Sequence, residues 1–127
     1  MDKQFEVNEE KGVAIITLVR QETYNTLTLE TLTALKSLLH SMATSNSIRV
    51  IVIGAEGKAF STGHDLKEIG KKSEKKFLQA LFSECTELML SIQRQPQPVI
   101  AQVQGIATAA GCQLVTSCDL VVASRKA

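Results

Sequence analysis

AFSTGHDL at residues 59–66 and GIATAAGCQL at residues 105–114 decide how this chain is interpreted. Each stretch is a turn of small residues that runs into a helix-forming segment, and such a turn leaves backbone N–H groups without an internal acceptor. Two N–H donors that point at one place polarise a carbonyl group there. Gln113 follows the second turn where a catalytic carboxylate would be useful, but an amide cannot exchange a proton. The chain therefore combines candidate donors with a missing base.

Around these turns, short β-branched runs alternate with longer helical patterns, which predicts an α/β fold with a mainly parallel sheet. Phe5-Glu6-Val7 is expected to add a leading antiparallel strand. Four runs rich in Val and Ile are expected to form buried strands: 13–19, 48–53, 99–103 and 120–123.

Apolar residues recur at helical spacing in two long segments, 29–42 and 77–92, and their apolar stripes are expected to face the core. Thr28 is a plausible N-cap of the first helix. A shorter, nearly all-apolar helix over 109–117 is expected to lie deep in the fold, because it stands between two predicted strands.

The length of 127 residues predicts one domain, 1–127, and the formal net charge of +1 gives no reason to expect nucleic acid or an anionic membrane as a partner. No segment reaches the roughly 20 apolar residues of a membrane span. The N-terminus is neither an apolar signal nor an Arg-rich transit peptide, so a cytoplasmic location is expected, or a mitochondrial one if a presequence has been removed.

The cysteines are three in number and lack CxxC spacing, so neither a disulfide framework nor a metal site is expected. Cys85, Cys112 and Cys118 are interpreted as buried small apolar residues. The only local charge run is interpreted either as a solvated helix start or as a patch for a phosphorylated ligand. It contains Lys67, Lys71, Lys72, Lys75 and Lys76.

STGHDLKE at 61–68 and AAGCQLV at 109–115, with SCD at 117–119, resemble the crotonase, or enoyl-CoA hydratase/isomerase, superfamily. The resemblance implies a crotonase-like ββα superhelix. It runs over essentially the whole chain but over only the N-terminal half to two-thirds of a family core. The chain is therefore expected to be a partial domain, truncated before the C-terminal helical region and the trimer contacts found in the family.

By the same resemblance, the backbone N–H groups of His64 and Ala110 would form an oxyanion hole for an acyl-CoA thioester. The substrate-binding residues would include Gly63, Asp65, Leu66, Lys67 and Gly111. RQETYN at 20–25 resembles a CoA-contacting loop, although Gln21 stands where a proline is frequent. No cofactor is expected beyond the coenzyme A of the ligand itself.

Three departures from the family pattern bear on chemistry. Gln113 stands at the position of a catalytic glutamate, and a second family glutamate would lie beyond residue 127, so hydration of an enoyl-CoA is expected to be very weak or absent. Ala110 replaces a frequent glycine, which costs about 1 kcal/mol if φ is positive there and nothing if the residue is helical. The His64 side chain would act as a base or face solvent.

The leading hypothesis is a crotonase-type acyl-CoA-binding protein with weak or absent hydratase activity. A second hypothesis is a non-enzymatic acyl-CoA binder or regulator. A third is an interaction protein that assembles with full-length relatives through apolar surface left uncovered by the missing part of the family core.

Overall fold

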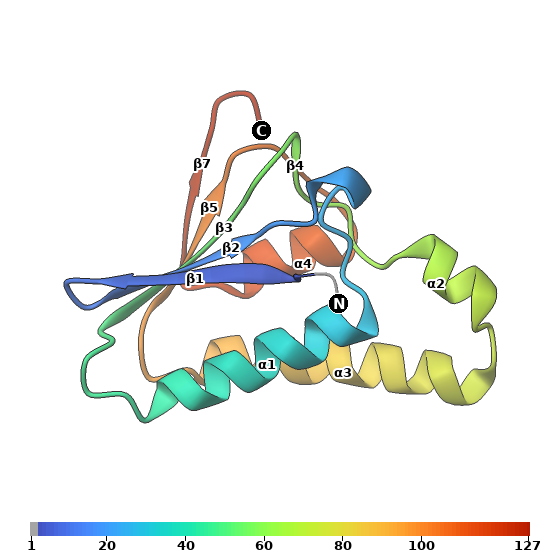
Figure 1. The fold of residues 1–127 in the computed structure, drawn as a ribbon, viewed down its shortest axis with the longest axis horizontal. Coiled ribbons are helices and arrows are strands. Elements are labelled where there is room, and N and C mark those ends of the chain that lie inside the picture. Colours follow the sequence, from blue (N-terminus) through green and yellow to red (C-terminus); the bar gives the residue numbers. More distant parts are fainter. Residues whose placement is uncertain (1–2) are drawn as a thin grey trace.

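The computed structural model describes residues 3–127 as a twisted sheet with two long helices packed along one face (Figure 1). The five strands of this sheet are ordered β1-β2-β3-β5-β7. Only β1 is antiparallel to its neighbour, and the other pairs are parallel, as the alternation of patterns predicted. The strands are β1 Phe5–Glu10, β2 Val13–Leu18, β3 Val50–Ala55, β5 Val99–Val103 and β7 Leu120–Ala123.

Strand β2 shows why the sheet forms where it does. Ala14, Ile16 and Leu18 are buried, while the residues between them are only half-buried, so one face of the strand meets the core. Strand β3 begins at Val50, two residues later than predicted, and the N–H groups of Arg49 and Val50 both donate to the Gly12 carbonyl where its ladder with β2 begins.

The two long helices, α1 Leu29–Ala43 and α3 Lys75–Arg94, form as predicted and pack against each other. Thr28 is the N-cap of α1, and its hydroxyl accepts a hydrogen bond from the Thr31 backbone N–H at 3.1 Å. None of the helices within residues 3–127 has the length and apolarity needed to cross a bilayer.

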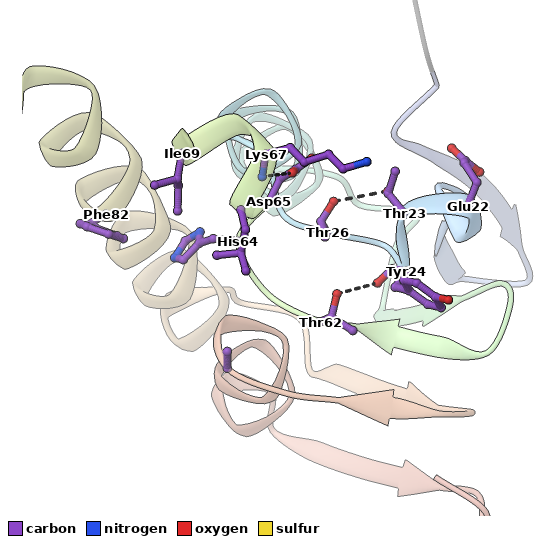
Figure 2. Close-up of a pocket in the computed structure, with 12 residues that line it drawn as sticks. Glu22, Thr23, Tyr24, Thr26, Thr62, His64, Asp65, Lys67, Ile69 and Phe82 are labelled. Atoms are coloured by element: carbon purple, nitrogen blue, oxygen red, sulfur yellow. Dashed lines mark hydrogen bonds between the residues drawn. The ribbon is translucent and has the colours of Figure 1, made fainter. Parts of the chain in front are cut away.

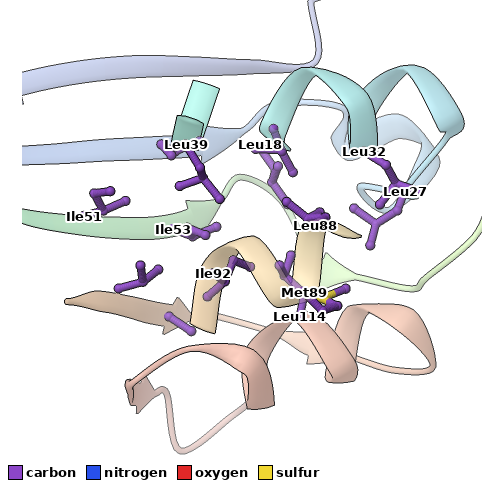
Figure 3. Packing of buried hydrophobic residues seen from close by; sticks show 14 of the residues in the cluster. Leu18, Leu27, Leu32, Leu39, Ile51, Ile53, Leu88, Met89, Ile92 and Leu114 are labelled. Carbon is purple, nitrogen blue, oxygen red and sulfur yellow. The ribbon is translucent and has the colours of Figure 1, made fainter. Parts of the chain in front are cut away.

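The hydrophobic core lies between the sheet and these helices (Figure 3). Leucine and isoleucine side chains from both layers meet there, and burial of each one contributes roughly 1.5–3 kcal/mol. This packing fixes the ends of β3 and β5, which lead into the two turns. The core includes Leu18 and Ile53 from the sheet, Leu32 and Leu39 from α1, and Leu88, Met89 and Ile92 from α3.

The remaining elements are short, and the two short strands and the 3-10 helix among them were not predicted. β4 Ala59–Ser61 pairs in parallel with β6 Ile106–Ala107 as a separate two-stranded sheet. The 3-10 helix Gln21–Thr23 follows β2, α2 Leu66–Lys71 follows β4, and α4 Ala110–Ser117 follows β6. Each of the two helices α2 and α4 therefore begins shortly after one strand of the small sheet.

Three predictions of burial were wrong. Strand β7 has all four residues exposed, because it is the sheet edge beside β5 and no other element of residues 3–127 covers it. Helix α4 buries only one face, so Cys112 is exposed and Cys118 half-buried, whereas Cys85 is buried as expected. Phe82, assigned to the core stripe of α3, is 50% exposed. Exposed apolar surface is therefore present, as the third hypothesis expected.

Candidate functional site

The first turn joins β4 to α2 and bends at Gly63, whose φ of 90° favours glycine. The Gly63 carbonyl accepts a hydrogen bond from the Leu27 N–H at 2.7 Å. The Asp65 carboxylate caps α2 by accepting from the N–H groups of Lys67 and Glu68 at 2.9 and 3.3 Å. Among residues 3–127, no acceptor is found for the N–H of His64.

The second turn joins β6 to α4 and satisfies most of the first helical turn from its own backbone. The Thr108 carbonyl accepts from the N–H groups of Gly111 and Cys112 at 2.8 and 3.3 Å, and the Ala109 carbonyl accepts from Gln113 at 3.0 Å. The Ala110 N–H has no acceptor within the described part of the chain. Each turn therefore has free N–H groups, His64 in the first and Ala110 in the second among them.

The backbone angles show whether Ala110, which stands where the family often has glycine, is strained. Ala110 opens α4 and has no positive φ, so alanine is harmless there. The unusual conformation falls one residue earlier, on Ala109, with φ 51° and ψ −127°. An L-residue with a side chain in such a conformation costs about 1–3 kcal/mol.

The two turns lie in direct backbone contact. The Thr108 N–H donates to the Ser61 carbonyl at 3.1 Å. A Cβ atom added at Gly111 would lie 2.2 Å from the same Ser61 carbonyl oxygen, and one added at Gly63 would lie 3.0 Å from the Ala110 backbone nitrogen. Only glycine allows this approach, so the free N–H groups of neighbouring turns are held in one small region.

A cavity of about 630 Å³ opens beside the turns (Figure 2). One wall is apolar and aromatic, from Leu66, Ile69 and Phe82, and the opposite wall carries the hydroxyl groups of threonine and tyrosine. Its lining residues are Glu22, Thr23, Tyr24, Thr26, Thr62, His64, Asp65, Leu66, Lys67, Ile69, Phe82 and Ala109.

The structure divides the residues predicted from sequence into three groups. His64, Asp65, Leu66 and Lys67 line the cavity, whereas Gly63, Ala110 and Gly111 form the backbone junction next to it. Gln113 does neither: it is exposed on α4, and its Oε1 lies 4.0 Å from the Cys85 Sγ on α3. Asp65 is occupied as the α2 cap, which makes its carboxylate structural.

The His64 ring packs against α3, and the residue is half-buried. Its ring lies edge-to-face with Phe82, 5.4 Å between centroids, and Figure 2 shows the ring between the turn and α3. The Nδ1 atom is buried and has no hydrogen-bond partner within residues 3–127. The alternative of a solvent-facing imidazole is therefore wrong for this nitrogen.

The loop over residues 20–25 forms one side of the cavity and is tied to the first turn. The buried Asn25 side chain donates from Nδ2 to the carbonyls of Glu56 and Ala59 at 2.8 and 2.9 Å. The Tyr24 carbonyl accepts from the Thr62 N–H at 3.2 Å. These bonds hold the loop at the cavity that His64 also lines, and its contact with CoA stays a prediction.

Every residue of the lysine run is exposed, and Lys67 is the member that lines the cavity. The Lys72 ammonium sits 5.5 Å above the Phe77 ring, a cation–π contact that holds it near the start of α3. Exposure agrees with the solvated interpretation, while a phosphate patch stays a prediction.

Two of the cysteines, Cys85 and Cys118, are poor nucleophiles because of their environment. Burial raises the pKa of the Cys85 thiol. Burial, followed by the negative charge of Asp119, raises the pKa of Cys118 to about 12. Both shifts deplete the reactive thiolate. Within residues 3–127, no three His, Cys, Asp or Glu side chains gather as a metal site.

Sequence reasoning missed several residues in the two walls of the cavity. Thr62 lay inside a quoted motif without a role, and Ile69, just after the last residue of that motif, Glu68, was not singled out. Phe82 follows the core stripe of α3 by spacing, and only the open space at that end of the helix exposes it. No sequence signal distinguishes it from the buried Cys85 one turn later.

The chain matches the enoyl-CoA hydratase/isomerase family over residues 8–127. It belongs to that family. It is similar to the mitochondrial enoyl-CoA hydratase domain-containing protein 3 of Homo sapiens, with 45% identity over 115 residues that cover 91% of this chain and 38% of the relative. The 2,3-dehydroadipyl-CoA hydratase of Escherichia coli K12 is 36% identical over 121 residues, covering 95% of this chain and 46% of the relative.

The crystal structure of human enoyl-coenzyme A hydratase domain-containing protein 3 superposes with a TM-score of 0.94 and 43% identity. That match covers 98% of this chain and 49% of the crystallised one, which confirms the crotonase fold. The chain thus spans less than half the length of these family members.

Proposed function

We propose that this enoyl-CoA hydratase/isomerase family member binds an acyl-CoA thioester in the cavity, with the free N–H groups of His64 and Ala110 donating to the thioester oxygen. The observation that carries the proposal is the junction at Gly63 and Gly111, which brings two unpaired N–H groups together beside the cavity. Fixed donors of this kind stabilise negative charge on a carbonyl oxygen.

The walls of the cavity support a ligand with two unlike parts. Leu66, Ile69 and Phe82 offer apolar surface for an acyl chain, and the 20–25 loop with Lys67 offers polar and charged groups for a nucleotide-containing portion. The names of the relatives agree, because the Escherichia coli relative is named as a hydratase of a CoA thioester.

We further propose that water addition to an enoyl-CoA is very weak or absent. The Gln113 amide cannot take up a proton, and its side chain lies outside the cavity near Cys85. General acid and base groups typically contribute about 10²- to 10⁴-fold each. Loss of crotonyl-CoA absorbance should stay at the buffer rate, and turnover at hundreds per second would contradict this proposal.

Calorimetry with two matched ligands tests the thioester contact. Butyryl-CoA and S-butyl-CoA differ in the carbonyl oxygen, which the thioether lacks. Two hydrogen bonds worth about 0.5–1.5 kcal/mol each predict roughly fivefold to 150-fold tighter binding of butyryl-CoA. Equal affinities would show that the free N–H groups do not meet the carbonyl, and no binding of either would reject the acyl-CoA cavity altogether.

A second candidate function is assembly with full-length family members, as in the family trimer. Exposed apolar residues favour it, since Leu120, Val121 and Val122 on β7 are all at least 48% exposed, and Ile106 is 54% exposed. Light scattering should then show oligomers that grow with concentration. A monomer across the accessible range would reject it.

We propose a mitochondrial location, because the similar human protein is named as mitochondrial. Fractionation of cells that express the natural transcript tests it, with enrichment alongside a matrix marker expected. Recovery only with cytosolic markers would favour the cytoplasmic alternative.

A further inference from the structure

We propose that the His64 imidazole is a specificity-determining residue, which hydrogen-bonds a hydroxyl group on an acyl carbon close to the thioester carbonyl. This inference rests on the proposed thioester site. The two parts of His64 have separate roles. The backbone N–H donates to the carbonyl oxygen, and the side chain hydrogen-bonds the hydroxyl group of the acyl chain.

The first step in the argument is the unsatisfied nitrogen. Nδ1 of His64 is buried and has no partner within residues 3–127, and a buried polar atom left unpaired destabilises the structure. A ligand that supplies a partner removes this destabilisation. The ring turns about its Cβ–Cγ bond, a torsion with two broad orientations, so Nδ1 can be presented to the cavity that the residue lines.

The second step is position. His64 carries both the free N–H and the ring, which are separated by only a few covalent bonds. A carbonyl oxygen at the N–H therefore brings the neighbouring acyl carbons next to the same residue's side chain. Phe82 holds the ring edge-to-face on its far side, which limits how far the imidazole can move away.

The third step is the choice of partner. A neutral imidazole has one donor and one acceptor nitrogen, so Nδ1 donates in one tautomer and accepts in the other. A hydroxyl group both donates and accepts, and it therefore pairs with Nδ1 in either tautomer. The surrounding apolar side chains of Leu66, Ile69 and Phe82 offer no competing partner. Of the other polar candidates from the sequence, Asp65 caps α2, Lys67 lines the cavity and Gln113 lies outside it.

Calorimetry with butyryl-CoA and 3-hydroxybutyryl-CoA, each enantiomer measured separately, tests the inference on the full chain. One enantiomer should bind roughly twofold to twelvefold tighter than butyryl-CoA, the range for one hydrogen bond. His64→Phe keeps the backbone N–H and an aromatic ring but removes both nitrogens, and it should bring this ratio to one. His64→Asn places an amide near the Nδ1 position and should restore part of the ratio.

The ratio of the affinities for 3-hydroxybutyryl-CoA and butyryl-CoA is unaffected by any loss of affinity that both ligands share. A ratio of one in the unmodified chain, or a preference that survives in His64→Phe, would overturn the role of the imidazole while butyryl-CoA binding leaves the thioester site intact. Failure of both ligands to bind a folded sample would instead overturn the thioester site, and this inference with it.

Discussion

The turn that contains Gly63 and the turn that contains Ala109 both carry the chain from the small sheet into a helix, yet they are built differently. The first takes its positive φ from a glycine and satisfies the helix start with the Asp65 side chain. The second takes its positive φ from an alanine and satisfies the helix start with the Thr108 carbonyl. Both turns leave backbone N–H groups free, including those of His64 and Ala110, so such a donor depends on backbone geometry and forms with different residues around it.

The largest expected effect comes from separating the two turns. In Gly111→Ala, the new methyl group would lie 2.2 Å from the Ser61 carbonyl oxygen. Overpacking costs about 3 kcal/mol, offset by about 1 kcal/mol of helix propensity, so the free energy of unfolding should fall by about 2 kcal/mol. Urea denaturation measures it, and butyryl-CoA affinity should fall in parallel.

Gly70→Ala is the matched control, because a Cβ atom at Gly70 meets nothing within 4 Å on the exposed helix α2. It should raise the free energy of unfolding by about 0.5–1 kcal/mol. Equal effects of the two substitutions would mean that the turns are not in contact at Gly111.

A smaller effect should fall on the first turn alone. Asp65→Ala removes the α2 cap and should cost about 1 kcal/mol. Hydrogen exchange should accelerate at the amides of Lys67 and Glu68, and stay unchanged at Gly111 and Cys112, which the Thr108 carbonyl holds. Asp65→Ser keeps a capping oxygen and should behave like the unmodified chain. Faster exchange at Gly111 as well would show that the turns are not independently capped.

The smallest effect tests the strained alanine. Ala109→Gly relieves the positive φ but adds chain entropy to the unfolded state, so a net stabilisation of about 0.5 kcal/mol is expected. Thermal denaturation measures whether the substitution raises or lowers stability. Ala80→Gly is the control, because it lies at an exposed interior position of α3 where glycine should cost about 1 kcal/mol. Destabilisation by both substitutions would contradict the assignment of strain to Ala109.

The long elements could be predicted because their patterns are repeated many times. Strand β5 was predicted at its observed bounds, and α1 with its Thr28 cap follows directly from the apolar spacing. β4 and β6 were missed because two or three residues are too few to show the alternation of apolar and polar side chains that marks a strand. They pair only after the core has brought them together. The burial of β7 was wrong because composition does not reveal which strand lies at an edge.

At the candidate site, the motif residues from His64 to Lys67 line the cavity, and their role in binding stays a prediction. The surroundings of individual side chains depend on three-dimensional packing that the sequence does not reveal. The direction of Gln113 follows from how α4 is rotated against α3, and that rotation is set by the contact of Gly111 with Ser61. The positive φ at Ala109, one residue from the position questioned in the sequence, depends on where α4 begins.

The free amide groups also determine how this site tolerates genetic change. Every standard amino acid except proline has a backbone N–H, so point mutations at codons 64 and 110 can alter the side chain while the amide persists. Selection on such a pair acts mainly on the glycines that let the turns approach each other. A lineage can therefore lose its acid–base residues and still inherit an intact amide frame on which a new specificity evolves.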